Sequence, residues 1–203
     1  MGDEEKQSLI YTIGHSNHTL DHLLELLQAN RIEVLADIRS RPYSGYNPQF
    51  DAPALEAAVS AAGIRYLFLG KELGGQPPDD QFYDSDGHVL YSRVAESNFF
   101  RSAISRLEAE ALQSRTALMC GEENPAECHR RLLVGRVLQE RGLEAAHIRG
   151  DGRVQTEAEL RREEAADRQG HVQLSLFETD EVAEWKSTQS VLEKRPPRHS
   201  SER

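Results

Sequence analysis

Five short runs of β-forming residues alternate along the chain with segments that repeat apolar residues at helical spacing. The first such segment carries Leu20, Leu23, Leu24 and Leu27, which share one helix face. Alternation of this kind requires a mostly parallel sheet with helices on both faces, joined by right-handed crossovers. We therefore predict one α/β domain over residues 9–170, with a five-stranded, mostly parallel sheet in three layers of the Rossmann or flavodoxin type. The predicted strands are Leu9–Ile13, Glu33–Ile38, Ile64–Leu69, Thr116–Met119 and Glu144–Ile148.

Residues that suit helix caps mark the ends of the predicted helices. Thr19 and Asp51 precede the first two helical patterns, and Thr156 precedes an acidic one late in the domain. Their side-chain oxygens can accept hydrogen bonds from the free backbone N–H groups of a first turn. Gly63 and Gly142 follow two of the patterns and can adopt the left-handed conformation that ends many helices.

Three stretches fall outside the alternation. Residues 70–97 are polar and rich in glycine and proline, and unstructured segments of this length are usually functional or disordered, so we predict a long loop or lid. Residues 1–8 are expected to form a flexible N-terminus. Residues 178–203 are polar and contain Pro196 and Pro197, which predicts a disordered tail.

Charge and cysteine content limit the kinds of function. The 203 residues carry a formal net charge of −10, whereas proteins that wrap nucleic acid are usually basic. Basic residues are concentrated in a few places, which favours a small anionic ligand. No apolar run approaches the roughly 18 residues of a membrane span, and no signal-peptide pattern opens the sequence. Two cysteines exclude the disulfide framework of small secreted proteins, so we predict a cytoplasmic protein with no membrane partner.

Polar and ionisable residues follow each predicted strand. His15 and Ser16 follow the first strand, Arg39 and Arg41 the second, and Cys120 ends the fourth. In open parallel sheets, ligands bind at the carboxyl ends of the strands. We therefore predict a shared crevice at this edge, in which His15, Ser16, Arg39 and Arg41 bind an anion. The alternative is that these are ordinary polar loops, which follow strands in any soluble protein.

The stretch from Cys120 to Arg130 carries the most specific signal. It runs from a predicted buried strand, through a short loop, into a helix whose first turn holds Cys128, His129 and Arg130. The positive end of a helix, beside a histidine and an arginine, favours a thiolate or a bound anion. We predict catalytic roles for Cys120, Glu122, Cys128 and His129, and anion binding by Arg130. Cys128 is expected to react faster than Cys120, which ends a buried strand.

Other interpretations of the two cysteines stay open. Cys120 could be a small buried hydrophobe, as free cysteines often are. The pair could be redox-active, although its spacing lacks the Cys-x-x-Cys signature. A zinc site would need two further ligands, for which His15 and His129 are the candidates, so metal ranks third and we assign none.

The loop from Arg39 to Phe50 combines two arginines with two serines and three aromatic residues. Arginine forks match phosphate and carboxylate groups, and tyrosine rings can stack on a base. The alternative is an ordered surface loop with salt bridges to Asp37 and Asp51. We favour anion binding.

Five ordered motifs resemble those of a known family. They are Thr12-Ile-Gly-His-Ser16, Asp37-Ile-Arg-Ser-Arg-Pro42, Leu69-Gly-Lys-Glu-Leu-Gly-Gly75, Met119-Cys-Gly-Glu122 and Cys128-His-Arg130. Together they resemble the uncharacterised bacterial and archaeal family called domain of unknown function 488, over about residues 9–152. The resemblance implies an α/β domain and no particular activity or cofactor. It also implies a site near His15, Arg39, Cys120, Glu122, Cys128, His129 and Arg130.

A short peptide beyond this region resembles a docking motif. Gln173-Leu-Ser-Leu-Phe177 looks like the segment by which bacterial replication and repair proteins bind the DNA polymerase sliding clamp. In that interpretation Gln173, Leu174, Leu176 and Phe177 contact the clamp, and residues 171–177 are exposed. The alternative is an amphipathic segment that packs its apolar side chains against the domain.

Two classes of function remain. The leading hypothesis is an enzyme that acts on a phosphate-containing substrate, a nucleotide or a nucleic acid, with arginines holding the anion and Cys, His and Glu carrying the chemistry. The rival is a non-catalytic protein that binds a ligand or the clamp and recruits other proteins. A thiol of lowered pKa in a concave pocket would favour the enzyme.

Overall fold

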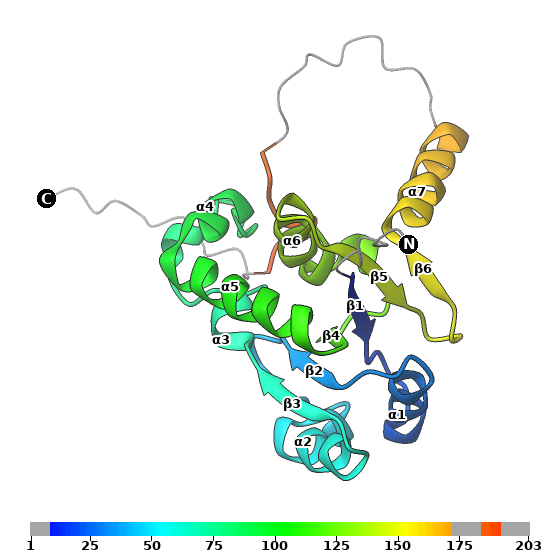
Figure 1. The fold of residues 1–203 in the computed structure, drawn as a ribbon. Helices are drawn as coiled ribbons and strands as arrows, with labels where there is room; N and C mark the ends of the chain where they lie inside the picture. The colour runs from blue at the N-terminus through cyan, green and yellow to red at the C-terminus, as the bar shows by residue number, and fades with distance from the viewer. Residues whose placement is uncertain (1–8, 172–183, 192–203) are drawn as a thin grey trace, which may run out of the picture.

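A six-stranded sheet with the order β3-β2-β4-β1-β5-β6 forms the centre of the molecule (Figure 1). The computed structural model describes residues 9–171 and 184–191. The strands are β1 (Leu9–Gly14), β2 (Val34–Asp37), β3 (Arg65–Phe68), β4 (Thr116–Cys120), β5 (Glu144–Ile148) and β6 (Val154–Thr156). Strands β1 to β5 pair in parallel, and β6 pairs antiparallel with β5. The predicted α/β class and mostly parallel sheet are confirmed, with six strands in place of five.

The sixth strand was missed because it carries little apolar signal. It has three residues, and only its central residue, Gln155, is buried. Gln155 satisfies its amide in the fold: its oxygen accepts a hydrogen bond from Arg149 at 2.7 Å, and its nitrogen donates to Glu163 at 2.5 Å. Polar contacts of this kind, made to residues outside the strand, leave no alternating apolar pattern in the sequence.

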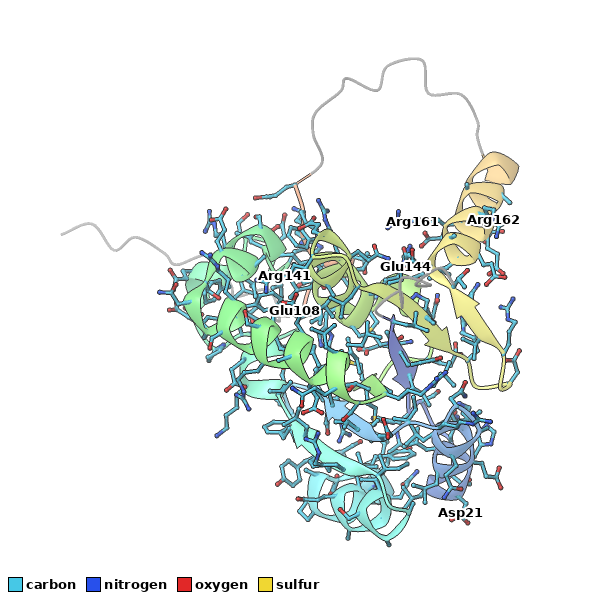
Figure 2. The ribbon with its side chains drawn as sticks, viewed as in Figure 1. Asp21, Glu108, Arg141, Glu144, Arg161 and Arg162 are labelled. Atoms are coloured by element: carbon cyan, nitrogen blue, oxygen red, sulfur yellow. The ribbon has the colours of Figure 1, made fainter. Side chains whose placement is uncertain are left out.

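Helices cover both faces of the sheet and give three layers. On one face lie α1 (Leu20–Ala29) and α2 (Ala52–Ala61), and on the other α5 (Asn98–Gln113) and α6 (Arg136–Glu140) (Figure 1). Charged side chains lie on the outer surfaces of the helices. Glu108 and Arg141, for example, form an ion pair with an N to O distance of 3.0 Å (Figure 2). The remaining helices are α3 (Gly70–Leu73), η2 (Asp80–Phe82), α4 (Tyr91–Glu96), η1 (Pro48–Phe50), η3 (Pro125–Glu127), the π-helical η4 (Arg130–Gly135) and α7 (Glu157–His171).

Alternate residues of each central strand enter opposite layers. In β4, Ala117 and Met119 belong to the apolar cluster with α1 and α2, whereas Leu118 belongs to the cluster with α5 and α6. This is the two-residue period of a strand buried on both faces. Cys120 therefore leaves the sheet on the side of α6, and its Cα pairs in register with that of Gly14.

Capping residues behave as predicted at two of three helices. Thr19 accepts a hydrogen bond from a backbone N–H of the first turn of α1. Thr156 and Glu159 form a reciprocal capping box at α7, with contacts of 3.2 and 2.7 Å. Asp51 precedes α2 but makes no capping bond, because its carboxylate accepts the backbone N–H of Ser44 at 2.8 Å. That bond ties the loop after β2 to α2.

The segment expected to be a long loop or lid contains ordered elements. Residues 70–97 include α3, η2 and α4, and they bury apolar side chains such as Leu73, Val89 and Leu90. Residues 184–191, which we call the strap, run along this segment, although they fall within the predicted disordered tail. Leu90 and Lys186 form an antiparallel bridge, and the strap's Trp185 donates its indole N–H to the carbonyl of Leu132 at 2.9 Å.

No helix within the described ranges is long and apolar enough to cross a membrane.

Candidate functional site

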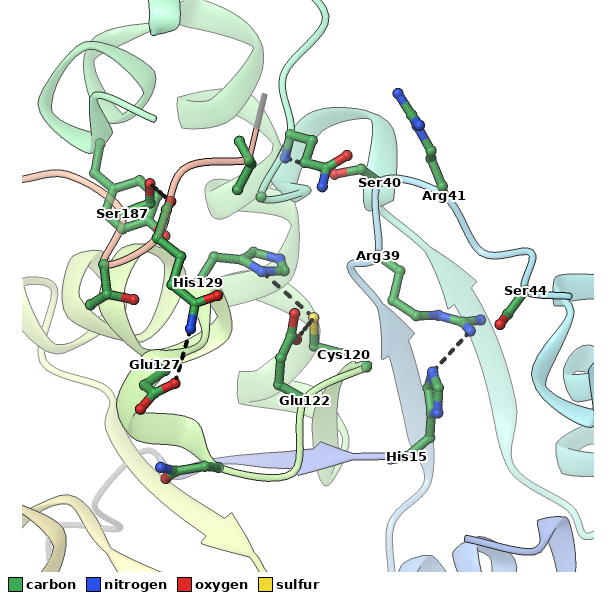
Figure 3. A pocket seen from close by; sticks show the side chains of 18 of the residues that line it. His15, Arg39, Ser40, Arg41, Ser44, Cys120, Glu122, Glu127, His129 and Ser187 are labelled. Carbon is green, nitrogen blue, oxygen red and sulfur yellow. Dashed lines mark hydrogen bonds between the residues drawn. The ribbon is translucent and has the colours of Figure 1, made fainter. Parts of the chain in front are cut away.

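A pocket of about 490 Å³ opens at the carboxyl ends of β1, β2 and β4 (Figure 3). Residues of six separate segments line it: His15 after β1, several residues between Arg39 and Ser44 after β2, Gly75 and Gln76 after α3, Tyr91 of α4, residues around η3 from Cys120 to Glu127 together with His129, and Ser187 to Val191 of the strap. The crevice predicted from the strand ends is thus present. The strap supplies one wall, which the sequence did not indicate.

Four predicted catalytic residues form one cluster at this pocket. The Cys120 and Cys128 thiols donate to the same oxygen of Glu122, with Sγ to Oε2 distances of 2.8 and 3.1 Å. Their sulfurs lie 3.6 and 3.9 Å from Nδ1 of His129. One donor atom from each residue lies within 4.8 Å of the others, so the set could hold a metal ion. Three of the four residues are buried, and Glu122 is the exposed member.

The His129 ring is held in one orientation. Its Nε2–H donates to the carbonyl of Ile38 at 3.1 Å, which leaves Nδ1 directed at the thiols. Gly75 lies against the ring, because a Cβ at that position would come within 2.8 Å of ring atoms. The Leu-Gly-Gly motif after β3 therefore provides space for His129, and only a residue without a side chain fits there.

The two thiols differ in ionisation. A hydrogen bond shared with Cys128, together with burial, raises the pKa of Cys120. Burial alone would raise the pKa of Cys128, but the Cys120 proton and the charges of Arg130 and His129 outweigh it and hold the pKa well below the usual value. Burial opposes protonation of His129, yet contact with Cys128 raises its pKa. Cys128 is therefore the more easily ionised of the two thiols.

The thiol that is more easily ionised is the less accessible of the two. Cys120 is 4% exposed and lines the pocket, whereas Cys128 is 1% exposed and lies behind it. The lowered pKa agrees with our expectation that Cys128 is the more easily ionised thiol, but a reagent would reach Cys120 first. Cys128 lies between η3 and η4, however, and not in the first turn of a helix as predicted, and its burial was not predicted.

A second group of linked side chains lies beside the cluster, after β2. Asp37 is fully buried and accepts two hydrogen bonds from the Arg39 side chain, at 2.9 and 2.6 Å, and one from the Tyr66 hydroxyl at 2.7 Å. Burial, and then the Asp37 charge, raises the pKa of Tyr66, which keeps the hydroxyl protonated. Arg39 directs its remaining nitrogen, Nη1, at Nε2 of His15, 3.3 Å away.

His15 is neutral in this arrangement. Burial lowers its pKa, and its Nδ1–H donates to the carbonyl of Ser16 at 2.8 Å. Nε2 therefore carries the lone pair that accepts from Arg39. Gly14 precedes it because the strand end touches the loop of the cluster: a Cβ at Gly14 would lie 1.8 Å from the carbonyl oxygen of Glu122.

Arg130 occupies a different place from the one expected. It is fully buried and does not line the pocket. Its guanidinium donates to the carbonyls of Glu122 and Glu123, the latter at 2.6 Å, and to the Thr12 hydroxyl at 3.3 Å. Arg130 therefore holds the loop that carries Glu122 and has no free face for an anion. A pattern of residue types cannot reveal that loop carbonyls occupy a guanidinium.

Behind Arg130, a buried polar chain continues towards α7. His147 bonds to Thr12 at 2.8 Å and to Glu157 at 3.1 Å, and Glu157 also pairs with Arg131 and Arg161. Burial alone would raise the pKa of Glu157, but these three partners lower it to about 2. The chain fixes α7 to the sheet, and its residues do not line the pocket.

The remaining predicted residues divide between the pocket and elsewhere. Arg41 lines the rim, and its side chain points outward from it (Figure 3). Ser16 has a positive φ of 47° and bonds to Asn17, outside the pocket lining. The peptide Gln173–Phe177 lies outside the described residues. Sequence reasoning missed Asp37 as a site residue, although it ends a buried strand two residues before Arg39.

Comparison with known proteins identifies a family. The model of the family described as Domain of unknown function DUF488 matches residues 19–137, from α1 into α6, including all four cluster residues. The chain matches no curated protein and no solved structure. Because the family match covers more than half of the 203 residues, this protein belongs to the family of domain of unknown function DUF488.

Proposed function

We propose that the protein is an enzyme acting on a phosphate-containing substrate, a nucleotide or a nucleic-acid end. The observation that supports this most is the composition of the pocket. One side offers guanidinium and hydroxyl donors from the loop after β2, and the other offers the thiol, carboxylate and imidazole of the cluster. Donors that hold an anion next to groups that exchange protons are the two requirements of such a site.

The donors on the β2 side have capacity for phosphate oxygens. Arg41 is exposed and makes no hydrogen bond or ion pair among the described residues. The Ser40 and Ser44 hydroxyls accept backbone N–H groups at 2.8 and 3.2 Å, so each O–H remains able to donate. Arg39 is neutralised by Asp37, and its contribution is the Nη1 edge directed towards His15 and the pocket.

Aromatic side chains beside these donors favour a nucleotide over inorganic phosphate. Tyr43 lines the pocket and is 64% exposed, and Tyr91 forms part of the opposite wall. An exposed tyrosine ring next to arginine and serine donors can stack on a base while the donors hold the phosphate. The net charge of −10 argues against long duplexes, so a short or mononucleotide substrate fits best.

The cluster would carry the reaction. Glu122 is exposed to the pocket and lies within hydrogen-bond distance of both thiols, which suits a group that passes protons between substrate and protein. Cys120, Cys128 and His129 lie too close to that carboxylate to act independently. We assign the four side chains to one reacting centre.

The test combines ligand binding with turnover. A thermal-shift screen of inorganic phosphate and nucleoside mono-, di- and triphosphates should identify a ligand, and calorimetry should measure its Kd. Arg41→Ala is expected to weaken binding roughly tenfold, the value of one charge-assisted contact. Arg106→Ala, an exposed arginine on α5, is the matched control and should leave Kd unchanged.

Turnover separates an enzyme from a binding protein. Glu122→Gln should bind the same nucleotide and abolish its conversion, followed by phosphate release and by chromatography of the nucleotide. The proposal fails if no phosphate compound shifts the melting temperature, or if Arg41→Ala and Arg106→Ala bind alike. Binding with no conversion by the wild-type protein would favour a non-catalytic ligand-binding role.

Docking to a DNA polymerase sliding clamp is a second proposal, and it rests on sequence alone. The peptide Gln173–Phe177 lies between α7 and the strap, outside the described residues. A glutamine followed by adjacent apolar residues suits peptide-in-groove recognition. Replacing Leu176 and Phe177 with alanine should abolish binding of a bacterial clamp in surface plasmon resonance, and unchanged binding would refute it. The two free thiols are consistent with a reducing compartment, for which we propose the cytoplasm.

A further inference from the structure

The four side chains of the cluster could act together as the ligands of one metal ion. They present two sulfurs, one imidazole nitrogen and one carboxylate oxygen within 4.8 Å of one another. Thiolate and imidazole donors in a group of four select zinc and similar divalent ions over magnesium or calcium, which prefer oxygen. We propose that Cys120, Cys128 and His129 bind one zinc ion, with Glu122 at the fourth position, facing the pocket.

The distances suit tetrahedral coordination. With zinc bonds of about 2.3 Å to sulfur and about 2.0–2.1 Å to nitrogen, tetrahedral ligand atoms lie roughly 3.3–3.8 Å apart. The sulfurs of Cys120 and Cys128 lie 3.6 and 3.9 Å from Nδ1 of His129. The Glu122 oxygen lies closer to the sulfurs, at 2.8 and 3.1 Å, and it belongs to the exposed member of the set.

The surroundings of His129 are those of a metal ligand. A ligating histidine almost always donates its other N–H to a carbonyl or carboxylate, which fixes the ring and its tautomer. Here Nε2–H donates to Ile38 and Nδ1 faces the sulfurs, while Gly75 removes any side chain that would displace the ring. The ring nitrogen that faces the sulfurs is thus held in the orientation that coordination requires.

Cys128 accepts a backbone hydrogen bond at its sulfur. The backbone N–H of Arg130 points at its sulfur from 3.5 Å, and the buried Arg130 guanidinium adds positive charge nearby.

The arrangement is that of a catalytic zinc site. Structural zinc sites are closed by four buried ligands, whereas catalytic sites use three protein ligands and keep one position open. Here three ligands are buried and the fourth faces the pocket (Figure 3). With zinc bound, Glu122 would be the ligand that a substrate or water could displace from the pocket side, and its carboxylate would then be free to accept a proton. The zinc site concerns the same pocket as the proposed enzyme and does not depend on the identity of its substrate.

The experiment measures metal in the full-length chain. Protein purified without chelator and dialysed against ZnCl2 should contain one zinc per chain by mass spectrometry of the digested protein. Replacement with CoCl2 should give visible bands of tetrahedral Co2+ and a near-ultraviolet sulfur-to-cobalt charge-transfer band. Cys128→Ser and His129→Gln should lose the metal. His22→Gln, which alters a half-buried histidine on α1 outside the pocket, is the matched control and should keep it.

Glu122→Ala distinguishes the two kinds of ligand. It should keep the charge-transfer band, because both sulfurs remain, and change the visible bands, with affinity weakened by about 10–100-fold. If Cys128→Ser does not fold, the zinc content and the Co2+ spectrum of the wild-type protein still test the zinc site. Substoichiometric zinc after dialysis, an aqueous Co2+ spectrum, or thiols that react equally fast with and without ZnCl2 would each overturn the zinc site. If the protein binds zinc but no nucleotide, the zinc site is supported and only the proposed substrate is refuted.

Discussion

Replacing Arg130 with methionine tests whether this arginine supports the site or binds substrate. Methionine keeps much of the side chain's length and apolar volume and removes the guanidinium. In the structure that group donates to the carbonyls of Glu122 and Glu123 and to Thr12, and it has no exposed surface. The substitution should therefore destabilise the folded protein and loosen the loop that carries Glu122.

The expected loss of stability follows from the hydrogen-bond acceptors that lose their donor when the guanidinium is removed. Thr12 keeps its contact with His147, but the two loop carbonyls lose their partner, and each unsatisfied buried acceptor costs about 1–3 kcal/mol. Removing the buried charge of Arg130 offsets part of this cost, because the guanidinium no longer has to be desolvated on folding. We therefore expect the free energy of unfolding to fall by about 2–4 kcal/mol. For a domain of this size, that corresponds to a fall in melting temperature of roughly 5–15 °C.

The assay is thermal and urea unfolding beside a matched variant. Arg41→Met removes an exposed arginine without partners among the described residues, and its stability should stay within about 0.5 kcal/mol of wild type. Arg130→Met should also weaken zinc binding, because its loop holds the cluster. The supporting role assigned to Arg130 is wrong if Arg130→Met has the same melting temperature as the wild-type protein. It is also wrong if Arg41→Met is the less stable of the two variants.

Three further predictions concern other parts of the fold. The folded-state pKa of Glu157, about 2, lies below its unfolded value near 4.5, so its stabilising contribution is complete above about pH 4.5 and lost as pH falls towards 2. Unfolding free energies across that range should decline less in Glu157→Gln, and equal slopes would contradict the assignment. Gly75→Ala should displace His129 and abolish zinc binding, whereas Gly45→Ala, where a Cβ meets open space, should retain it. Trp185 is the single tryptophan, so nucleotide binding beside the strap should change its fluorescence. Trp185→Ala should weaken that binding by loosening the strap, and an unchanged Kd would contradict a role for Trp185 in holding this wall of the pocket.

The sheet could be predicted because its signal is local. Each of the five parallel strands contains a short apolar run, and Gly63 and Gly142 have the positive φ values of 76° and 87° expected of residues that end helices. The same reasoning placed His15, Arg39 and Cys120 at one edge, since parallel strands bring their carboxyl ends together. Those three residues line the pocket.

The features that sequence reasoning missed depend on distant contacts. Lys186 pairs with Asp84 at 2.7 Å across 102 residues, which orders the strap in a stretch whose composition predicts disorder. Arg130 looks like an anion-binding residue until the loop carbonyls that occupy it are placed. The metal interpretation of Cys120 and Cys128 ranked third because only folding shows that Glu122 and His129 reach the same point.

X-ray absorption at the zinc edge tests the central claim most directly, namely that the four cluster residues bind one zinc ion at the pocket. The full-length chain loaded with one equivalent of ZnCl2 should show two sulfur neighbours at about 2.3 Å and two nitrogen or oxygen neighbours at about 2.0–2.1 Å. Cys120→Ser should show one sulfur. A wild-type spectrum with only nitrogen and oxygen neighbours would contradict the claim, because zinc would then lie away from the thiols of Cys120 and Cys128.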